Sequence, residues 1–179
     1  MVLDDVQGVS MASLATGIGA RNVVVMRNPM NPYSNHLAEV FATHLQALGF
    51  AAPQMVSYSV DNTAPAIAQL VAADPDAVYL PDFMDNVNTL LGAARDQGID
   101  APFLGSDGWD FPTLNLNDAE GCYFPAPYVA QDSRPVAADF RDAYRLAYVA
   151  EPDSIAAHAY DAMALLLTSI AEAGVDDAA

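Results

Sequence analysis

Short apolar stretches recur along the first two thirds of the chain and are separated by longer amphipathic segments. These stretches are residues 22–27, 54–58, 77–80, 102–105 and 122–125. Most of them are continuous rather than alternating, which is the pattern of strands that are covered on both faces. Strands of this kind that alternate with helices predict an α/β fold with an open, mostly parallel, doubly wound sheet of about five strands.

The intervening segments have helical periodicity and residues that start or end helices. Leu37 and Phe41 belong to an apolar stripe at helical spacing, and Gly49 follows that stripe as a stop signal. Thr63 and Pro65 precede another apolar segment. A threonine hydroxyl can cap a helix and proline suits the first turn, so we expect a helix to begin there.

The alternation ends near residue 126, because no further strand pattern follows it. A proline-rich segment at 125–135 leads to two predicted helices, at about 134–148 and 155–173. We therefore predict an α/β lobe over residues 1–126, followed by a crossover and a helical pair over residues 127–179.

The composition narrows the possible partners. The chain has 23 acidic residues against 6 basic ones and a net charge of -17, which disfavours nucleic acid as a partner. Hydrophobic residues make up 53% of the sequence, so a packed core is expected. We find neither an unbroken apolar run of about 20 residues nor the basic start of a secretion signal, and expect no membrane span or signal peptide in this chain.

A candidate site lies at the ends of the predicted strands. In open α/β sheets, ligands bind beyond the carboxyl ends of the strands, and here those positions carry aromatic and acidic side chains. Carboxylates can pair with a cationic group while aromatic rings exclude water, so this set suits a small ligand with an amine and suits phosphate poorly. The candidate ligand-binding residues are Tyr33, Phe83, Asp107 and Trp109.

The sequence lacks the motifs of several catalytic sites. No GxGxxG follows the first predicted strand, no GxSxG is present, and no histidine pair has HExxH spacing. Asp82 and Asp85 could in principle bind a hard cation, but the ligand ladder of an EF-hand loop is missing. We therefore expect no catalysis, no cofactor and no metal, although a stand-alone regulatory or enzymatic domain of flavodoxin-like topology remains the alternative.

Four segments in order resemble landmarks of a known family. They are VVVMRNPMNPYSNHLAEVFATHLQALGF, VAADPDAVYLPDF, APFLGSDGWD and AHAYDAMALLLTSIAEAG. Together they resemble the type I periplasmic solute-binding proteins, in particular the leucine/isoleucine/valine-binding branch that serves ABC transporters.

The resemblance implies two α/β lobes that bind an amino acid or a related amide between them and deliver it to an ABC permease, in the periplasm or outside the cell. Residues 1–126 are similar to the second lobe, and the first lobe is missing from this chain. On the family pattern Asp107 would pair with the ligand ammonium, Tyr33 and Phe83 would face the ligand, and Trp109 would close the edge of the pocket. Because the two terminal helices would lack their partner, we expect a homo-oligomer or a domain swap.

Overall fold

The computed structural model describes residues 4–174, apart from the side chain of Asp85, and shows two compact units. The first unit is Val2–Pro125 and the second begins at Ala126. Each unit is described separately below.

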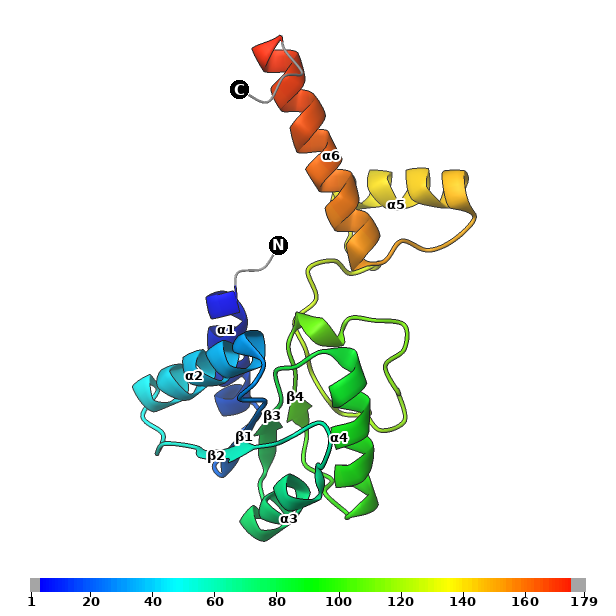
Figure 1. Ribbon diagram of the computed structural model, residues 1–179. Coiled ribbons are helices and arrows are strands. Elements are labelled where there is room, and N and C mark those ends of the chain that lie inside the picture. The colour runs from blue at the N-terminus through cyan, green and yellow to red at the C-terminus, as the bar shows by residue number, and fades with distance from the viewer. Residues whose placement is uncertain (1–3, 175–179) are drawn as a thin grey trace. The chain divides into compact units, whose positions relative to one another are not determined.

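The first unit is a doubly wound α/β layer structure (Figure 1). Its strands are all parallel, in the order β2-β1-β3-β4. The four strands fall where the apolar stretches predicted the first four, which confirms the fold class. In chain order the elements are α1 (Asp4–Gly17), β1 (Val23–Arg27), α2 (Pro32–Ala47), β2 (Gln54–Ser57), α3 (Ala64–Ala73), β3 (Ala77–Tyr79), α4 (Met84–Asp96), β4 (Phe103–Leu104) and the 3-10 helix η1 (Asp107–Trp109).

The fifth predicted strand is reduced to a single bridge. Tyr123 pairs with Leu104 in the parallel direction. The Tyr123 amide donates to the Phe103 carbonyl at 2.9 Å, and the Gly105 amide donates to the Tyr123 carbonyl at 2.7 Å. The segment at 122–125 therefore follows the edge of β4, but its pairing is too short to form a regular strand.

Helices cover both faces of the sheet, which explains why the strands are continuously apolar. On β1, Val23 and Val25 belong to a buried cluster with α1 and α2, whereas Val24 and Met26 belong to a second buried cluster with α3 and α4. Figure 1 shows α1 and α2 grouped on one side of the strands and α3 and α4 on the other. Side chains alternate across a strand, so each strand contributes to both cores.

The predicted end of α2 and the predicted start of α3 are both confirmed, but the predicted side-chain cap at Thr63 is absent. Gly49 follows α2 with φ 92°, a left-handed conformation that glycine adopts without a steric penalty. Thr63 makes no side-chain cap at α3, because its own backbone is already helical at φ -84° and ψ -19°. Its carbonyl instead accepts hydrogen bonds from the amides of Ala66 and Ile67.

The second unit contains the two helices that the sequence predicts, α5 (Pro135–Tyr148) and α6 (Ser154–Ala173). Phe140 of α5 is buried, and its ring centroid lies 5.7 Å from that of Tyr128, 5.9 Å from that of Tyr144 and 4.9 Å from that of Tyr160. This aromatic cluster joins α5 to α6 and to the segment that precedes α5.

Most of the apolar surface of α6 is exposed. Met163 is 53% exposed and Leu167 is 58% exposed. By length and composition alone, α6 is sufficient to cross a membrane, a property that it shares with helices packed inside proteins. Polar side chains such as His158 and Asp161 interrupt the apolar sequence of α6, so it contains no unbroken apolar run, and the absence of a membrane span stays an expectation.

Candidate ligand-binding site

Three of the four predicted site residues lie together at the carboxyl edge of the sheet. Tyr33 lies in the first turn of α2, after β1; Phe83 precedes α4, after β3; and Asp107 starts η1, after β4. β1 and β4 both flank β3, so the segments that follow these three strands emerge side by side. We call Tyr33, Phe83 and Asp107 the shelf.

The shelf residues contact one another directly. The Tyr33 hydroxyl donates to Asp107 Oδ1 at 2.6 Å. The rings of Tyr33 and Phe83 are stacked, with centroids 4.7 Å apart and planes 20° apart. Phe83 is 49% exposed, whereas Tyr33 and Asp107 are half-buried. The shelf thus presents one aromatic surface and one carboxylate to an incoming molecule.

The local sequence explains the position of Tyr33. Asn31 caps α2, because its side-chain oxygen accepts the Tyr33 amide at 3.1 Å, and Pro32 occupies the first turn. Burial, followed by the hydrogen bond to Asp107, raises the pKa of the Tyr33 hydroxyl well above its ordinary value. Tyr33 therefore remains a neutral hydrogen-bond donor to the carboxylate at neutral pH.

Asp107 keeps an unused acceptor. Among the described residues, no basic side chain forms an ion pair with it, and its Oδ2 accepts no hydrogen bond. Arg27, the last residue of β1, is engaged with α2, since its Nη1 donates to Asn35 at 3.0 Å and lies 3.8 Å from a carboxylate oxygen of Glu39. Because Arg27 is engaged with α2, the carboxylate of Asp107 can accept a hydrogen bond from a cationic group of a ligand.

Trp109 lies beneath the shelf rather than at its edge. Its side chain is fully buried, and its Nε1 donates to the Leu80 carbonyl at 3.1 Å. A Cβ on Gly105 would lie 2.4 Å from the indole, so the ring occupies the space that a side chain would fill. In this structure the ring has no surface that a ligand could touch, which corrects the expectation that Trp109 closes the pocket edge.

Two further residues support the site and were not predicted. Gln7 of α1 is fully buried, and its Oε1 accepts the Asp107 amide at 2.9 Å. Asp82, which the sequence analysis treated as a possible cation ligand, is fully buried and accepts hydrogen bonds from several neutral donors. Gln7 carries no local sequence signal, because its partner is 100 positions away.

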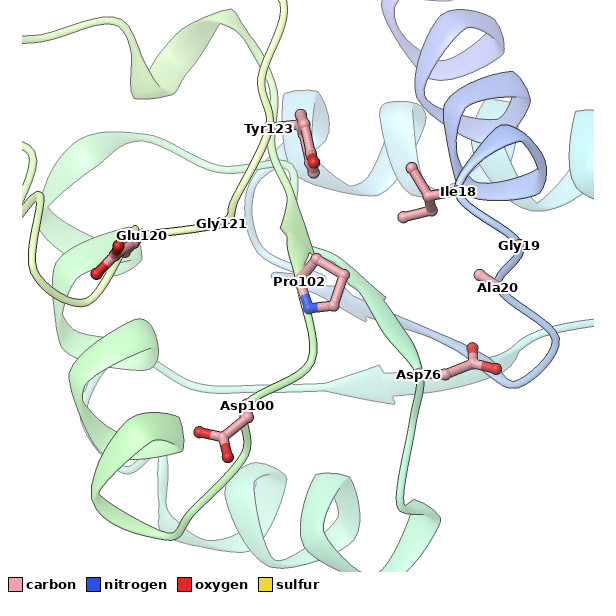
Figure 2. A pocket seen from close by; sticks show the side chains of 9 residues that line it. All are labelled: Ile18, Gly19, Ala20, Asp76, Asp100, Pro102, Glu120, Gly121 and Tyr123. Carbon is pink, nitrogen blue, oxygen red and sulfur yellow. The ribbon is translucent and has the colours of Figure 1, made fainter.

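A separate cavity of about 430 Å³ lies at the opposite, amino-terminal edge of the sheet (Figure 2). Asp76, Asp100 and Glu120 are among the residues that line it. Asp76 is engaged there, since its carboxylate accepts the amides of Arg21 and Asn22 at 2.8 and 2.9 Å. Within residues 4–174 no cluster of side chains is arranged to hold a metal ion.

Comparison with known proteins places these observations in context. A family model described as periplasmic binding protein matches residues 2–179. A search of curated proteins found no match.

Solved structures share this fold over nearly the whole chain. A leucine-binding protein, LivK, from Thermotoga maritima is 29% identical with a TM-score of 0.88, and the match covers 98% of this chain and 52% of that protein. The LivJ substrate-binding protein from Streptococcus pneumoniae, solved with isoleucine, is 24% identical with a TM-score of 0.81, and the match covers 95% of this chain and 50% of that protein. The chain thus spans about half the length of these proteins.

Proposed function

Because the chain belongs to the periplasmic binding protein family, we propose that it forms part of the solute-binding component of an ABC transporter. The ligand is an amino acid or a related small amine or amide, and the protein binds it without catalysis. The observation that carries this proposal is the contact between Tyr33 and Asp107 at the carboxyl edge of the sheet.

The chemistry of the shelf suits an ammonium group. Asp107 uses Oδ1 to accept the Tyr33 hydroxyl, and its Oδ2 is available for a second donor. A charge-assisted hydrogen bond of this kind contributes about 1.5–3 kcal/mol. The Tyr33 and Phe83 rings would flank the cation and exclude water, which strengthens the interaction. Trp109 would support this arrangement from below without touching the ligand.

The ligand's carboxylate or amide end needs groups that the shelf does not offer. Arg27, the last residue of β1, is hydrogen-bonded to Asn35 of α2. The matched structures are about twice as long as this chain. We propose that residues 1–126 act as one ligand-binding lobe, that residues 127–179 form a crossover and a helical pair, and that a second lobe completes the site.

The location and partners follow from the same proposal. A binding component of this kind works in the periplasm or outside the cell and delivers its ligand to an ABC permease. The exposed apolar side chains of α6, such as Met163 and Leu167, would pack on the second lobe. In the 179-residue chain alone, we expect a homo-oligomer or a domain swap to cover them. A mass equal to that of the monomer by light scattering, with α6 well protected from hydrogen exchange, would contradict this expectation.

The central test is a calorimetric titration of the protein that carries both proposed lobes, with ligands that differ in one group. Isoleucine and 3-methylpentanoate differ mainly in the amine, so we expect only isoleucine to bind through the shelf. Asp107→Asn should weaken isoleucine binding about tenfold or more, which corresponds to about 1.4 kcal/mol. Asp100→Asn is the matched control, because Asp100 lies at the opposite edge of the sheet (Figure 2). Equal affinity in the Asp107→Asn variant and the parent would refute the proposed role.

The alternative, an enzymatic or regulatory domain of flavodoxin-like topology, has less support. The family match extends over residues 2–179 and the family binds solutes, generally without catalysis.

A further inference from the structure

A buried carboxyl group lies directly beneath the two aromatic residues of the shelf. Asp82 follows β3 and has no exposed surface. Its Oδ1 accepts the Asn31 side-chain amide at 2.8 Å and the Phe83 backbone amide at 2.8 Å. Its Oδ2 accepts the Asn86 side-chain amide at 3.0 Å and the Tyr58 hydroxyl. Burying such a group is unfavourable unless it is well hydrogen-bonded, and here four donors converge on it.

Two of these four donors lead to the shelf. Asn31 donates to Asp82 with its amide nitrogen, while its amide oxygen accepts the Tyr33 backbone amide at 3.1 Å. Asn31 therefore links Asp82 to the first turn of α2, where Tyr33 lies. The Phe83 amide donates to Asp82 directly. One carboxyl group thus fixes the backbone beneath both rings of the stacked pair.

The backbone of Asp82 also contacts the segment that carries Asp107. The Ser106 hydroxyl donates to the Asp82 carbonyl at 3.4 Å. A Cβ on Gly108 would lie 2.7 Å from the same carbonyl oxygen, so only glycine fits there without displacement. Both neighbours of Asp107 in the sequence therefore pack against Asp82.

We propose that Asp82 is the positioning residue of the shelf: it holds Tyr33, through Asn31, and Phe83, through its amide, in the stacked arrangement that receives the ligand. Where ligand binding is concerned, this inference rests on the proposed function. The two aspartates have different roles because their exposure differs. Asp107 is half-buried with a free oxygen, whereas Asp82 is fully buried and accepts four hydrogen bonds.

The test must separate positioning from a general contribution to stability. Asp82→Asn preserves the size of the side chain but replaces one acceptor oxygen with a donor that faces donors. The control is Asp76→Asn, because the Asp76 carboxylate also accepts backbone amides, from Arg21 and Asn22, but lies at the opposite, amino-terminal edge of the sheet. If Asp82 only stabilises the fold, the two variants should leave the geometry of the shelf equally intact.

The readout is the contact between the two rings, measured by nuclear Overhauser effects between Tyr33 and Phe83 in the 179-residue chain without ligand. We expect the parent and Asp76→Asn to show these effects and Asp82→Asn to lose at least half of their intensity. Unchanged ring contacts in a folded Asp82→Asn variant would overturn the proposal.

A second variant keeps the proposal testable if Asp82→Asn does not fold. Asn31→Asp retains an oxygen that can cap α2 but loses the amide that donates to Asp82. We expect weaker ring contacts in Asn31→Asp, and full contacts there would overturn the proposal.

Isoleucine titration of the protein that carries both proposed lobes then separates the two proposals. Asp82→Asn should lower the affinity about tenfold, and Asp76→Asn should leave it unchanged. If Asp82→Asn loses the ring contacts while Asp107→Asn does not affect isoleucine binding, the positioning role holds and the proposed function fails. If Asp107→Asn abolishes binding while Asp82→Asn keeps the ring contacts, the positioning role fails alone.

Discussion

The packing of Trp109 against Gly105 gives a quantitative prediction for Gly105→Ala. The new Cβ would lie 2.4, 2.5 and 2.8 Å from three indole carbons, about 1 Å inside the usual carbon–carbon contact distance. The indole cannot yield easily, because it is fully buried and its Nε1 donates to the Leu80 carbonyl at 3.1 Å. Overpacking costs about 1–3 kcal/mol, and losing the buried hydrogen bond adds about 1–3 kcal/mol. We therefore expect Gly105→Ala to lower the free energy of unfolding by about 3 kcal/mol or more.

Urea unfolding followed by tryptophan fluorescence measures this change, because Trp109 is the single tryptophan of the chain. With a slope of about 1–3 kcal/mol/M for a small domain, the midpoint should fall by about 1 M or more. Gly17→Ala is the matched control, since no atom lies within 4 Å of the added Cβ and alanine favours a helix. Its midpoint should stay constant or rise. A Gly105→Ala midpoint equal to that of the parent would refute the packing argument.

Two further predictions concern buried tyrosines. Tyr79→Phe should be neutral or stabilise the fold by up to about 1 kcal/mol, because the Tyr79 hydroxyl is buried without a hydrogen-bond partner; a loss above that amount in urea unfolding would contradict this. Burial and the hydrogen bond to Asp82 raise the pKa of Tyr58 above its ordinary value of about 10, so the unfolded chain loses this proton first. Stability that is present below about pH 10 should therefore fall as the pH rises further, and Tyr58→Phe should flatten this decline in urea midpoints; an unchanged pH dependence in the variant would contradict the assignment.

Much of the fold can be predicted from periodicity and from residues that end helices. The four strands have continuous apolar segments because helices cover both faces of the sheet, and Gly49 marks the end of α2 correctly. The segment at 122–125 has a strand-like composition but forms only one bridge. The length of a strand depends on how many residues its neighbour offers for pairing, and local composition does not determine that number. The neighbour of this segment is β4, which has only two residues.

The sequence could predict the position of a candidate site residue only where the order of strands in the sheet determines that position. Tyr33, Phe83 and Asp107 follow strands that end at the same edge of the sheet, so the strand rule brought them together correctly. The burial of Trp109 depends on the missing side chain of Gly105, and the role of Asp82 depends on Asn31 and Tyr58, which lie 51 and 24 positions away. Such long-range contacts leave no periodic signal in the sequence.

The most direct test of the account is a crystal structure of the protein with bound isoleucine. We predict that the ligand nitrogen lies about 3 Å from Asp107 Oδ2, beside the stacked rings of Tyr33 and Phe83. A ligand bound with its carboxylate toward Asp107, or at the amino-terminal edge near Asp76 and Asp100, would contradict the central claim.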